Sequence, residues 1–570
     1  MDHPQIHFEV FARRAGGSGF RLELATEDRA QALSAAEEML QGGKYIGVKV
    51  TKETRDPDTG EYKSVGILTK GQMEVPKSKA PVEDRGPPCV SPADLYNVHA
   101  REVIGRLLEG WLVRNRATPF ELLHRPDLIE KLEASGVELQ HAVQKIAVPE
   151  AQARGVGVHE IIRNFQELIQ RAIDRVLADR KKGNFPDLAK EDFSDACRRL
   201  TGDPERSYHL GAAVASHIGA ARSWSDKVGL LLDLADAAPA AGPPRALAFQ
   251  VLEQALGEIL GSRVGLADLL GVDLDFGGGL AALTRLAAAD TVAALARVDA
   301  NVARLIPPLS GSAERLARWL DDPGFENVRL AVCKRVLKEL TVLKRLRPSD
   351  PRGEIDLLRA LAMALTSASG RSLQLEEVRD AFVERSKMLV AADFVDAYLS
   401  SGRSTFHEAL DLIWLLENVT GAANKRQAVR WLLSTVTSLK FETELTASTS
   451  PPTAHLGQLA ELHRQVCRAG GDVAGVDTVL LRLGELGGRI EASAKLTTLL
   501  ARASGPLVQR LGLLLKMAAG ETAPLGPASD RAKAEALKLI RLPDARTALA
   551  QAPEVLAQVR GLMQSIEAAA

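Results

Sequence analysis

Two different spacings of apolar residues divide this chain of 570 residues into two parts. In the first seventy residues apolar and polar side chains alternate, as at Phe8, Val10 and Ala12, and this period of two is typical of β-strands. From residue 92 onward the apolar residues recur every three or four positions, as on one face of a helix. We therefore expect a mainly α protein: an irregular multi-layer helical body, solenoid-like or a bundle, with a small N-terminal α+β module.

The N-terminal module is predicted to have the order ββαββ. Strands are expected at 7–13, 20–24, 46–51 and 62–68, with Gly16-Gly17-Ser18-Gly19 and Asp56 to Gly60 as turns and a helix that Thr26 caps and Gly42-Gly43 end. One face of the sheet is expected to be open, carrying Phe11, Arg13, Arg21, Tyr45 and Lys49 as a candidate stacking platform for nucleic-acid bases. The twelve basic and twelve acidic residues up to Lys79 argue against that use, because a balanced module gains little from counterion release.

Proline and glycine clusters suggest how the chain is organised. We predict a module at 1–73, a proline-rich linker at 74–91, a helical domain at 92–205, a large helical domain at 206–520, and a hinge with C-terminal helices at 521–570. A long amphipathic helix at 158–177 carries a broad apolar stripe. Packing inside the same domain is the favoured interpretation, and self-association into a homo-oligomer through this helix is the alternative.

The most distinctive charged segment is a basic amphipathic helix predicted at 327–347. At helical spacing Lys334, Lys338 and Arg345 share one stripe, while Val332, Val336, Leu340 and Leu343 fall on the opposite side. Such a stripe is a candidate site for an anion or an acidic partner, and a solvated face paired with acids from a neighbouring helix is the plainer interpretation.

Catalytic motifs are not evident. His407, Glu408 and Asp411 come closest to a metalloprotease pattern, since residues four apart share a helix face, but the second histidine is missing. The glycine runs lack the lysine of a phosphate loop, and no nucleophile turn is present. No catalytic residue, metal or cofactor is therefore expected, and an enzyme with a site assembled from scattered residues stays an alternative.

Charge and cysteine content narrow the function further. Lys and Arg number 72 and Asp and Glu 73, so no global field gathers nucleic acid or an anionic membrane. The four cysteines lie far apart, and neither a secretory signal nor a membrane-spanning stretch is evident, which favours a cytoplasmic location. We expect a non-catalytic protein-interaction scaffold or adaptor. The main alternative is a nucleic-acid or anionic-surface binder that uses the helix at 327–347.

Overall fold

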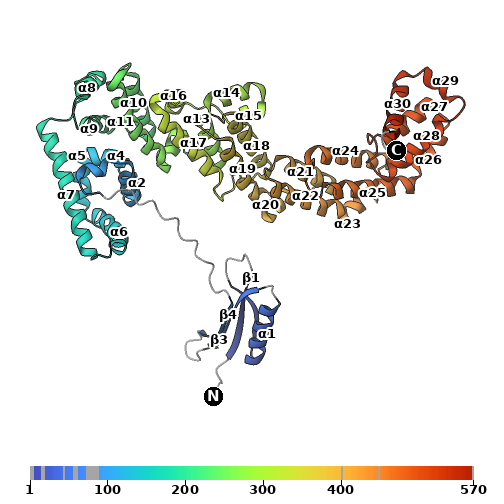
Figure 1. Cartoon of the computed structure of the whole chain (residues 1–570), viewed down its shortest axis with the longest axis horizontal. Coiled ribbons are helices and arrows are strands. Elements are labelled where there is room, and N and C mark those ends of the chain that lie inside the picture. The colour runs from blue at the N-terminus through green and yellow to red at the C-terminus, as the bar shows by residue number, and fades with distance from the viewer. Residues whose placement is uncertain are drawn as a thin grey trace. The chain divides into compact units, whose positions relative to one another are not determined.

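The computed structural model describes residues 6–14, 20–42, 45–55, 62–71, 89–370, 372–399, 402–446 and 450–567. The chain forms two compact units, Met1–Val90 and Ser91–Ala570 (Figure 1). Helices account for 73% of the residues, and the strands found among the described residues all lie in the first unit. The prediction of a mainly α protein with a small α/β module is therefore confirmed.

The first unit is a four-stranded antiparallel sheet with one helix on one face. Its elements are β1 (Ile6–Arg14), β2 (Arg21–Thr26), α1 (Arg29–Gln41), β3 (Tyr45–Arg55) and β4 (Tyr62–Gly71), and the strand order is β2-β1-β3-β4. Val10 on β1 lies opposite Val50 on β3, and both are buried with Ala32 and Ala36 of α1. The alternation seen in the sequence thus separates the helix-covered face from the open face.

Two details of this module differ from the predictions. Asp28 caps α1, accepting from the amide of Ala30 at 2.7 Å, whereas Thr26 is the last residue of β2. Arg21 pairs with Ala12, and Tyr45 pairs with Arg14 beyond an irregularity in the β1–β3 register.

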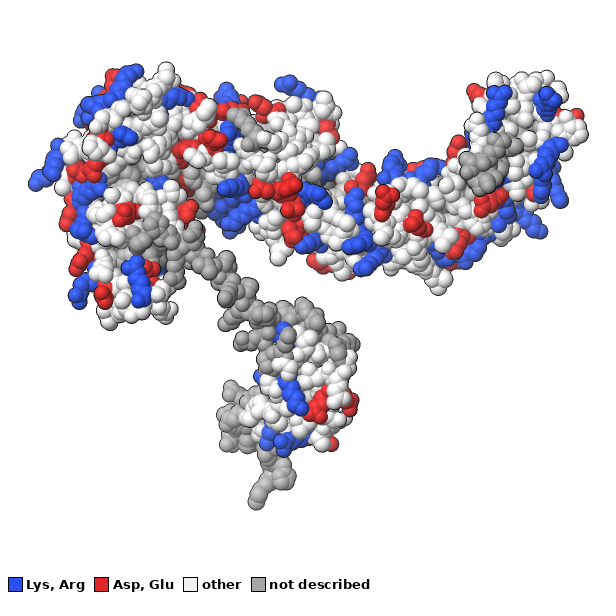
Figure 2. All heavy atoms as spheres, viewed as in Figure 1, with Lys and Arg blue, Asp and Glu red and all other residues white. Residues whose placement is uncertain are grey.

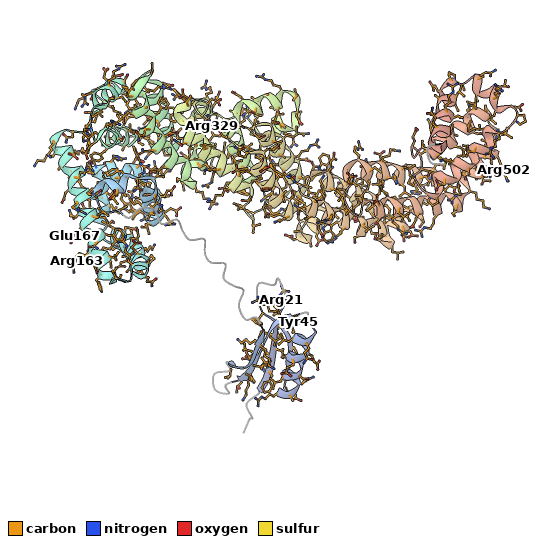
Figure 3. The ribbon with its side chains drawn as sticks, viewed as in Figure 1. Arg21, Tyr45, Arg163, Glu167, Arg329 and Arg502 are labelled. Atoms are coloured by element: carbon orange, nitrogen blue, oxygen red, sulfur yellow. The ribbon has the colours of Figure 1, made fainter. Side chains whose placement is uncertain are left out.

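That register places Arg21 and Tyr45 on the helix-covered side of the sheet, where Tyr45 packs against the buried core (Figure 3). The predicted platform therefore loses two of its members. Phe11, Arg13 and Lys49 share the opposite face, where Lys49 is exposed but Arg13 is buried. The turns expected at 16–19 and 56–60, and all of the expected linker except residues 89–91, lie outside the described residues.

The second unit is entirely helical in its described residues and begins with a group of helices around α7. These elements are the 3₁₀ helix η1 (Pro92–Tyr96), α2 (Val98–Leu107), α3 (Glu109–Arg114), α4 (Pro119–His124), α5 (Pro126–Ser135), α6 (Val137–Arg154), α7 (Val158–Lys182) and α8 (Phe193–Leu200). The apolar stripe of α7 is covered inside the chain: Ile161 packs against α6, and Val176 packs in a cluster with Ile129 of α5. Arg163 and Glu167, labelled in Figure 3, lie on its exposed face. Self-association through this helix stays untested.

The middle helices continue one buried core. They are α9 (Arg206–Ile218), α10 (Trp224–Asp236), α11 (Gly242–Gly261), α12 (Arg263–Leu270), α13 (Phe276–Ala287), α14 (Ala289–Val298), α15 (Ala300–Leu305), α16 (Gly311–Trp319), η2 (Pro323–Phe325), α17 (Glu326–Leu340), α18 (Pro351–Ser367), α19 (Leu375–Leu389) and α20 (Ala392–Leu399). A single cluster of buried apolar residues runs from Phe120 to Val559. It crosses the boundaries predicted at 205/206 and 520/521, and the subdivision of the helical unit stays a prediction.

The last helices pack as stacked pairs. They are α21 (Thr405–Asn418), α22 (Ala422–Thr437), α23 (Leu439–Thr446), α24 (Pro452–Gly470), α25 (Val476–Ala494), α26 (Leu496–Arg502), α27 (Leu507–Ala518), α28 (Pro527–Ile540), α29 (Ala545–Ala550) and α30 (Pro553–Glu567). The pair α18/α19 contacts α21/α22, which in turn contacts α24/α25 (Figure 1). The first helices of these pairs begin at residues 351, 405 and 452, so successive layers are offset by 54 and 47 residues.

One close approach fixes the C-terminal helices against α25. A Cβ atom added to Gly484 would lie 2.4 Å from the carbonyl oxygen of Leu525, and one added to Gly487 would lie 2.4 Å from Pro524. The loop before α28 therefore rests directly on the backbone of α25. Pro524 and Ala523 are buried there, in the segment that the sequence suggested as a hinge.

Membrane-spanning potential is low along the described residues. None of their helices has by itself the length and apolar content needed to cross a bilayer, and α13 and α14 reach that content only as a pair bent by 110°.

Candidate functional site

The predicted basic helix is shorter than expected. Helix α17 ends at Leu340, and residues 341–350 form a loop rather than two further turns of helix. Arg345 is therefore not on the helical stripe with Lys334 and Lys338, and Leu343 is 85% exposed instead of packing with Leu340. The helical spacing of apolar residues continues in the sequence beyond the end of α17, because Leu346 also packs in the core. Its backbone, however, is part of the loop and not of the helix.

A buried carboxylate on α18 holds this loop. Glu354 accepts hydrogen bonds from the backbone amides of Leu346 at 3.1 Å and Arg347 at 3.3 Å, and from Nε of Arg345 at 2.7 Å. Nη2 of Arg385 donates to the same carboxylate at 3.2 Å, and its Nη1 donates to the carbonyl of Val342 at 2.8 Å. Because these contacts use backbone amides that a helix would hydrogen-bond internally, Glu354 competes with the helix and ends it.

The three cations predicted as a site have two different environments. Lys334 and Lys338 are exposed on consecutive turns of α17 and form no ion pair with any described residue. Arg345 is mostly buried, is paired with Glu354, and lies 4.4 Å from the ring centre of Phe394. Arg329, at the start of α17 (Figure 3), donates to Ser372 and to the carbonyl of Leu320. Lys334 and Lys338 are therefore available to a partner, and the two arginines serve the fold.

The loop that follows α17 adds exposed apolar residues close in sequence to the lysines. We define the α17 surface as Lys334, Lys338, Val342, Leu343 and Lys344, all of which are exposed. Leu343 has the largest exposed fraction among the described large apolar side chains, at 85%, and Val342 is 38% exposed. Three exposed lysines and an exposed leucine between residues 334 and 344 combine long-range attraction for acidic groups with a site of apolar contact.

The residues of the suspected metal site are engaged elsewhere. Nδ1 of His407 lies 2.8 Å from Oγ of Ser404, and Glu408 faces Lys440 at 3.6 Å. Asp411 is nearly buried and pairs with Arg352 and with Arg403. Among the described residues no group of three or more histidine, cysteine or acidic side chains is arranged to hold a metal ion.

The sequence did not indicate a cavity between α10 and α16. It has a volume of about 330 Å³ and is lined by Asp236, Arg315, Arg318 and Trp319. Arg315 donates to Asp236 at 2.8 Å and pairs with Asp233 at 2.9 Å, while Nε1 of Trp319 donates to Asp236 at 3.2 Å. Trp319 is partly buried against the core, and it was not predicted as a site residue. The signal present in the sequence was a tryptophan with arginines one and four positions before it on the same helix.

A second buried charged cluster joins α4 to α10 and α11. Nζ of Lys227 lies 2.7 Å from both carboxylate oxygens of Glu121 and also donates to the carbonyl of Arg116. Oε2 of Glu258 accepts from the amide of Phe120 at 2.6 Å. Arg101 Nε lies 3.0 Å from Glu258 Oε1, but its N–H does not point at that oxygen. These groups have no access for a ligand, and we assign them to the fold.

This cluster predicts a pH dependence of stability. Burial raises the pKa of Glu258 from 4.5 to about 7, so the folded state holds this proton more tightly and Glu258 lowers the unfolding free energy as pH rises from 4.5 to 7. Burial lowers the pKa of His124 from 6.5 to about 3. His124 therefore raises the unfolding free energy as pH rises from about 3 to 6.5, which is the opposite of the effect of Glu258.

The two slopes should nearly cancel in the wild type. In Glu258→Gln the downward slope is removed, so the unfolding free energy of the variant relative to the wild type should rise by about 3 kcal/mol between pH 4.5 and 7. Urea denaturation at half-unit pH steps measures this difference. A difference that stays constant across the range would contradict the raised pKa of Glu258.

The surface as a whole carries both signs of charge. Figure 2 shows basic and acidic residues interspersed along the visible face of the helical unit, consistent with the net charge of −1. Cys197, Cys333 and Cys467 are free thiols. Comparison with known protein families, with curated proteins and with solved structures found no match.

Proposed function

We propose that the protein is a non-catalytic scaffold or adaptor of the cytoplasm whose helical unit binds partner proteins through the α17 surface. The observation that supports this is Leu343, which is 85% exposed and lies in the loop directly after α17, the helix that carries Lys334 and Lys338. Neither of these lysines has an acidic partner among the described residues. The partner segment that fits is acidic and presents an apolar side chain.

Two contributions favour binding of a partner protein at this surface. An exposed leucine gains roughly 1.5 to 3 kcal/mol when a partner removes it from water. Lysines at the rim of such a contact contribute less affinity but accelerate encounter with an acidic partner. Glu354 already holds the loop that carries Leu343 through hydrogen bonds to its backbone. The loop therefore loses little conformational entropy when a partner binds.

The alternative is binding of nucleic acid or an anionic surface. Lys334 and Lys338 would serve it equally well, since phosphate contacts need cations only. Leu343 separates the two hypotheses: a protein partner uses the apolar side chain, whereas a phosphate backbone does not.

The test compares two defined probes. A labelled helical peptide with glutamate and leucine on one face is titrated against wild type, Leu343→Ser and the double variant Lys334→Glu/Lys338→Glu, with fluorescence anisotropy as the readout. Each variant should weaken peptide binding about tenfold or more. A matched control is Lys181→Glu/Lys182→Glu, which reverses two exposed lysines of α7 and should leave the affinity unchanged.

The second probe is a single-stranded oligonucleotide at low and moderate salt. Oligonucleotide binding that weakens with salt and in the α17 double variant but is equal in Leu343→Ser would overturn the protein-binding proposal in favour of the alternative. Absence of peptide binding to the wild type would also overturn it.

A further inference from the structure

We propose that the cavity between α10 and α16 is a second binding site, specific for an aromatic carboxylate. It rests on its own geometry and does not depend on the α17 surface. The ligand chemistry is a single carboxylate attached to a flat ring, as in a small aromatic acid or in the C-terminal residue of a peptide.

The floor of the cavity is a supported indole ring. Trp319 is half-buried at the C-terminal end of α16, and its ring centre lies 5.7 Å from that of Phe249 and 5.8 Å from that of Phe325. The guanidinium carbon of Arg245 lies 4.2 Å from the ring centre of Phe249. Nη2 of Arg245 donates to both carboxylate oxygens of Asp322. These contacts fix the plane of the indole before a ligand arrives, so little side-chain entropy is lost on binding.

Next to the indole, a preorganised ion pair also lines the cavity. Nη2 of Arg315 contacts Asp233 at 2.9 Å and Asp236 at 2.8 Å, linking α16 to the last turn of α10. Oδ1 of Asp236 is occupied by the indole N–H of Trp319. Both oxygens of Asp236 therefore already have donors, and the cavity offers a ligand few free acceptors.

What remains free is a hydrogen-bond donor. Arg318 is exposed, lines the cavity and has no ion pair or hydrogen bond with any described residue. A guanidinium presents a planar fork of N–H groups that matches the two oxygens of a carboxylate. Because Arg315 is shared by two aspartates, Arg318 supplies the positive charge on its own, and a ligand with one negative charge fits better than a multiply charged phosphate.

The volume of the cavity limits the size of the aromatic carboxylate that it can hold. A volume of about 330 Å³ is at the small end of ligand sites, which span roughly 300 to 1,000 Å³. It suits one residue or one small molecule. A flat ring stacks on the face of Trp319 in an offset arrangement while its carboxylate reaches Arg318.

The experiment uses the full chain and three probes: N-acetyl-phenylalanine, its C-terminal amide, and a hexapeptide ending in phenylalanine with a free carboxylate. Isothermal titration calorimetry should give saturable binding of the acid with a Kd of about 1 mM or below, and the amide should bind at least tenfold more weakly. Arg318→Ala should weaken binding of the acid about tenfold. Arg318→Lys should have an affinity between those of the wild type and Arg318→Ala, because lysine keeps the positive charge but lacks the planar N–H groups of a guanidinium.

Matched controls separate this site from the rest of the surface. Arg502→Ala removes an exposed arginine without a partner among the described residues (Figure 3) and should leave binding unchanged, as should Lys334→Glu/Lys338→Glu. A hexapeptide that binds about tenfold more tightly than the acid supports a peptide C-terminus as the source, and equal affinities support a free aromatic acid. Equal binding of acid and amide, no effect of Arg318→Ala, or no saturation by the acid would each overturn the proposal.

Discussion

Replacing Glu354 with glutamine is expected to destabilise the helical unit by about 3 to 5 kcal/mol, the range seen when one partner of a buried ion pair is removed. Arg385 is fully buried and would lose its carboxylate, while Nε of that residue already has no hydrogen bond. The amides of Leu346 and Arg347 would also lose a charged acceptor. The measurement is the midpoint of the first unfolding transition in urea at pH 7.

A matched control is Glu339→Gln. Glu339 pairs with Arg335 at 2.7 Å on the partly exposed side of α17, and loss of that pair should cost less than about 1 kcal/mol. If Glu354→Gln were no more destabilising than Glu339→Gln, the proposed role of Glu354 in ending α17 would be wrong. Hydrogen exchange of residues 341–350 gives a local readout, since their protection should fall first in the variant.

Lys227→Met is the second large effect, again about 3 to 5 kcal/mol of lost stability. Burial lowers the pKa of Lys227, which shows that the interior disfavours its charge, yet Glu121 is completely buried and needs that charge. In the variant, Glu121 keeps only Arg125 as an ion-pair partner, at 3.1 Å. Thermal and urea unfolding should both report the loss.

A second substitution should partly reverse it. Adding Glu121→Gln to Lys227→Met removes the uncompensated carboxylate, and glutamine still completes the capping box with Thr118 at the start of α4. The double variant should therefore be more stable than Lys227→Met alone. Lys387→Met, which breaks an exposed pair with Glu384, provides the control and should change stability by less than about 1 kcal/mol. Additive losses in the double variant would contradict the pairing argument.

The fold was predictable where local patterns and packing agree. Alternation in β1 and β3 placed Val10 and Val50 in the core, and the 3.6-residue spacing of α7 placed Ile161 and Val176 there. The end of α17 was not predictable, because the signal that stops the helix is a carboxylate fourteen residues beyond Leu340. Leu343 and Leu346 keep helical spacing in the sequence although the backbone there is a loop.

The candidate sites were predictable only in part. Lys334 and Lys338 follow from helical spacing, and both are exposed as expected. The pairing of Arg345 with Glu354 depends on the loop between α17 and α18, which the helical spacing did not predict. The assembly of Trp319 with Asp236 joins two helices that are distant in sequence. Charge type and spacing reveal which face a residue occupies, but the partner across a helix–helix contact is set by tertiary packing.

The glycines of α25 link the formation of that helix to what docks on it. Gly484, Gly487 and Gly488 each cost a helix roughly 1 kcal/mol relative to alanine. Where the loop before α28 lies on them, the absent side chains are replaced by the contacts of Pro524 and Pro527. The packing of α25 therefore depends on the C-terminal helices, and we expect this end of the molecule to unfold as one cooperative unit.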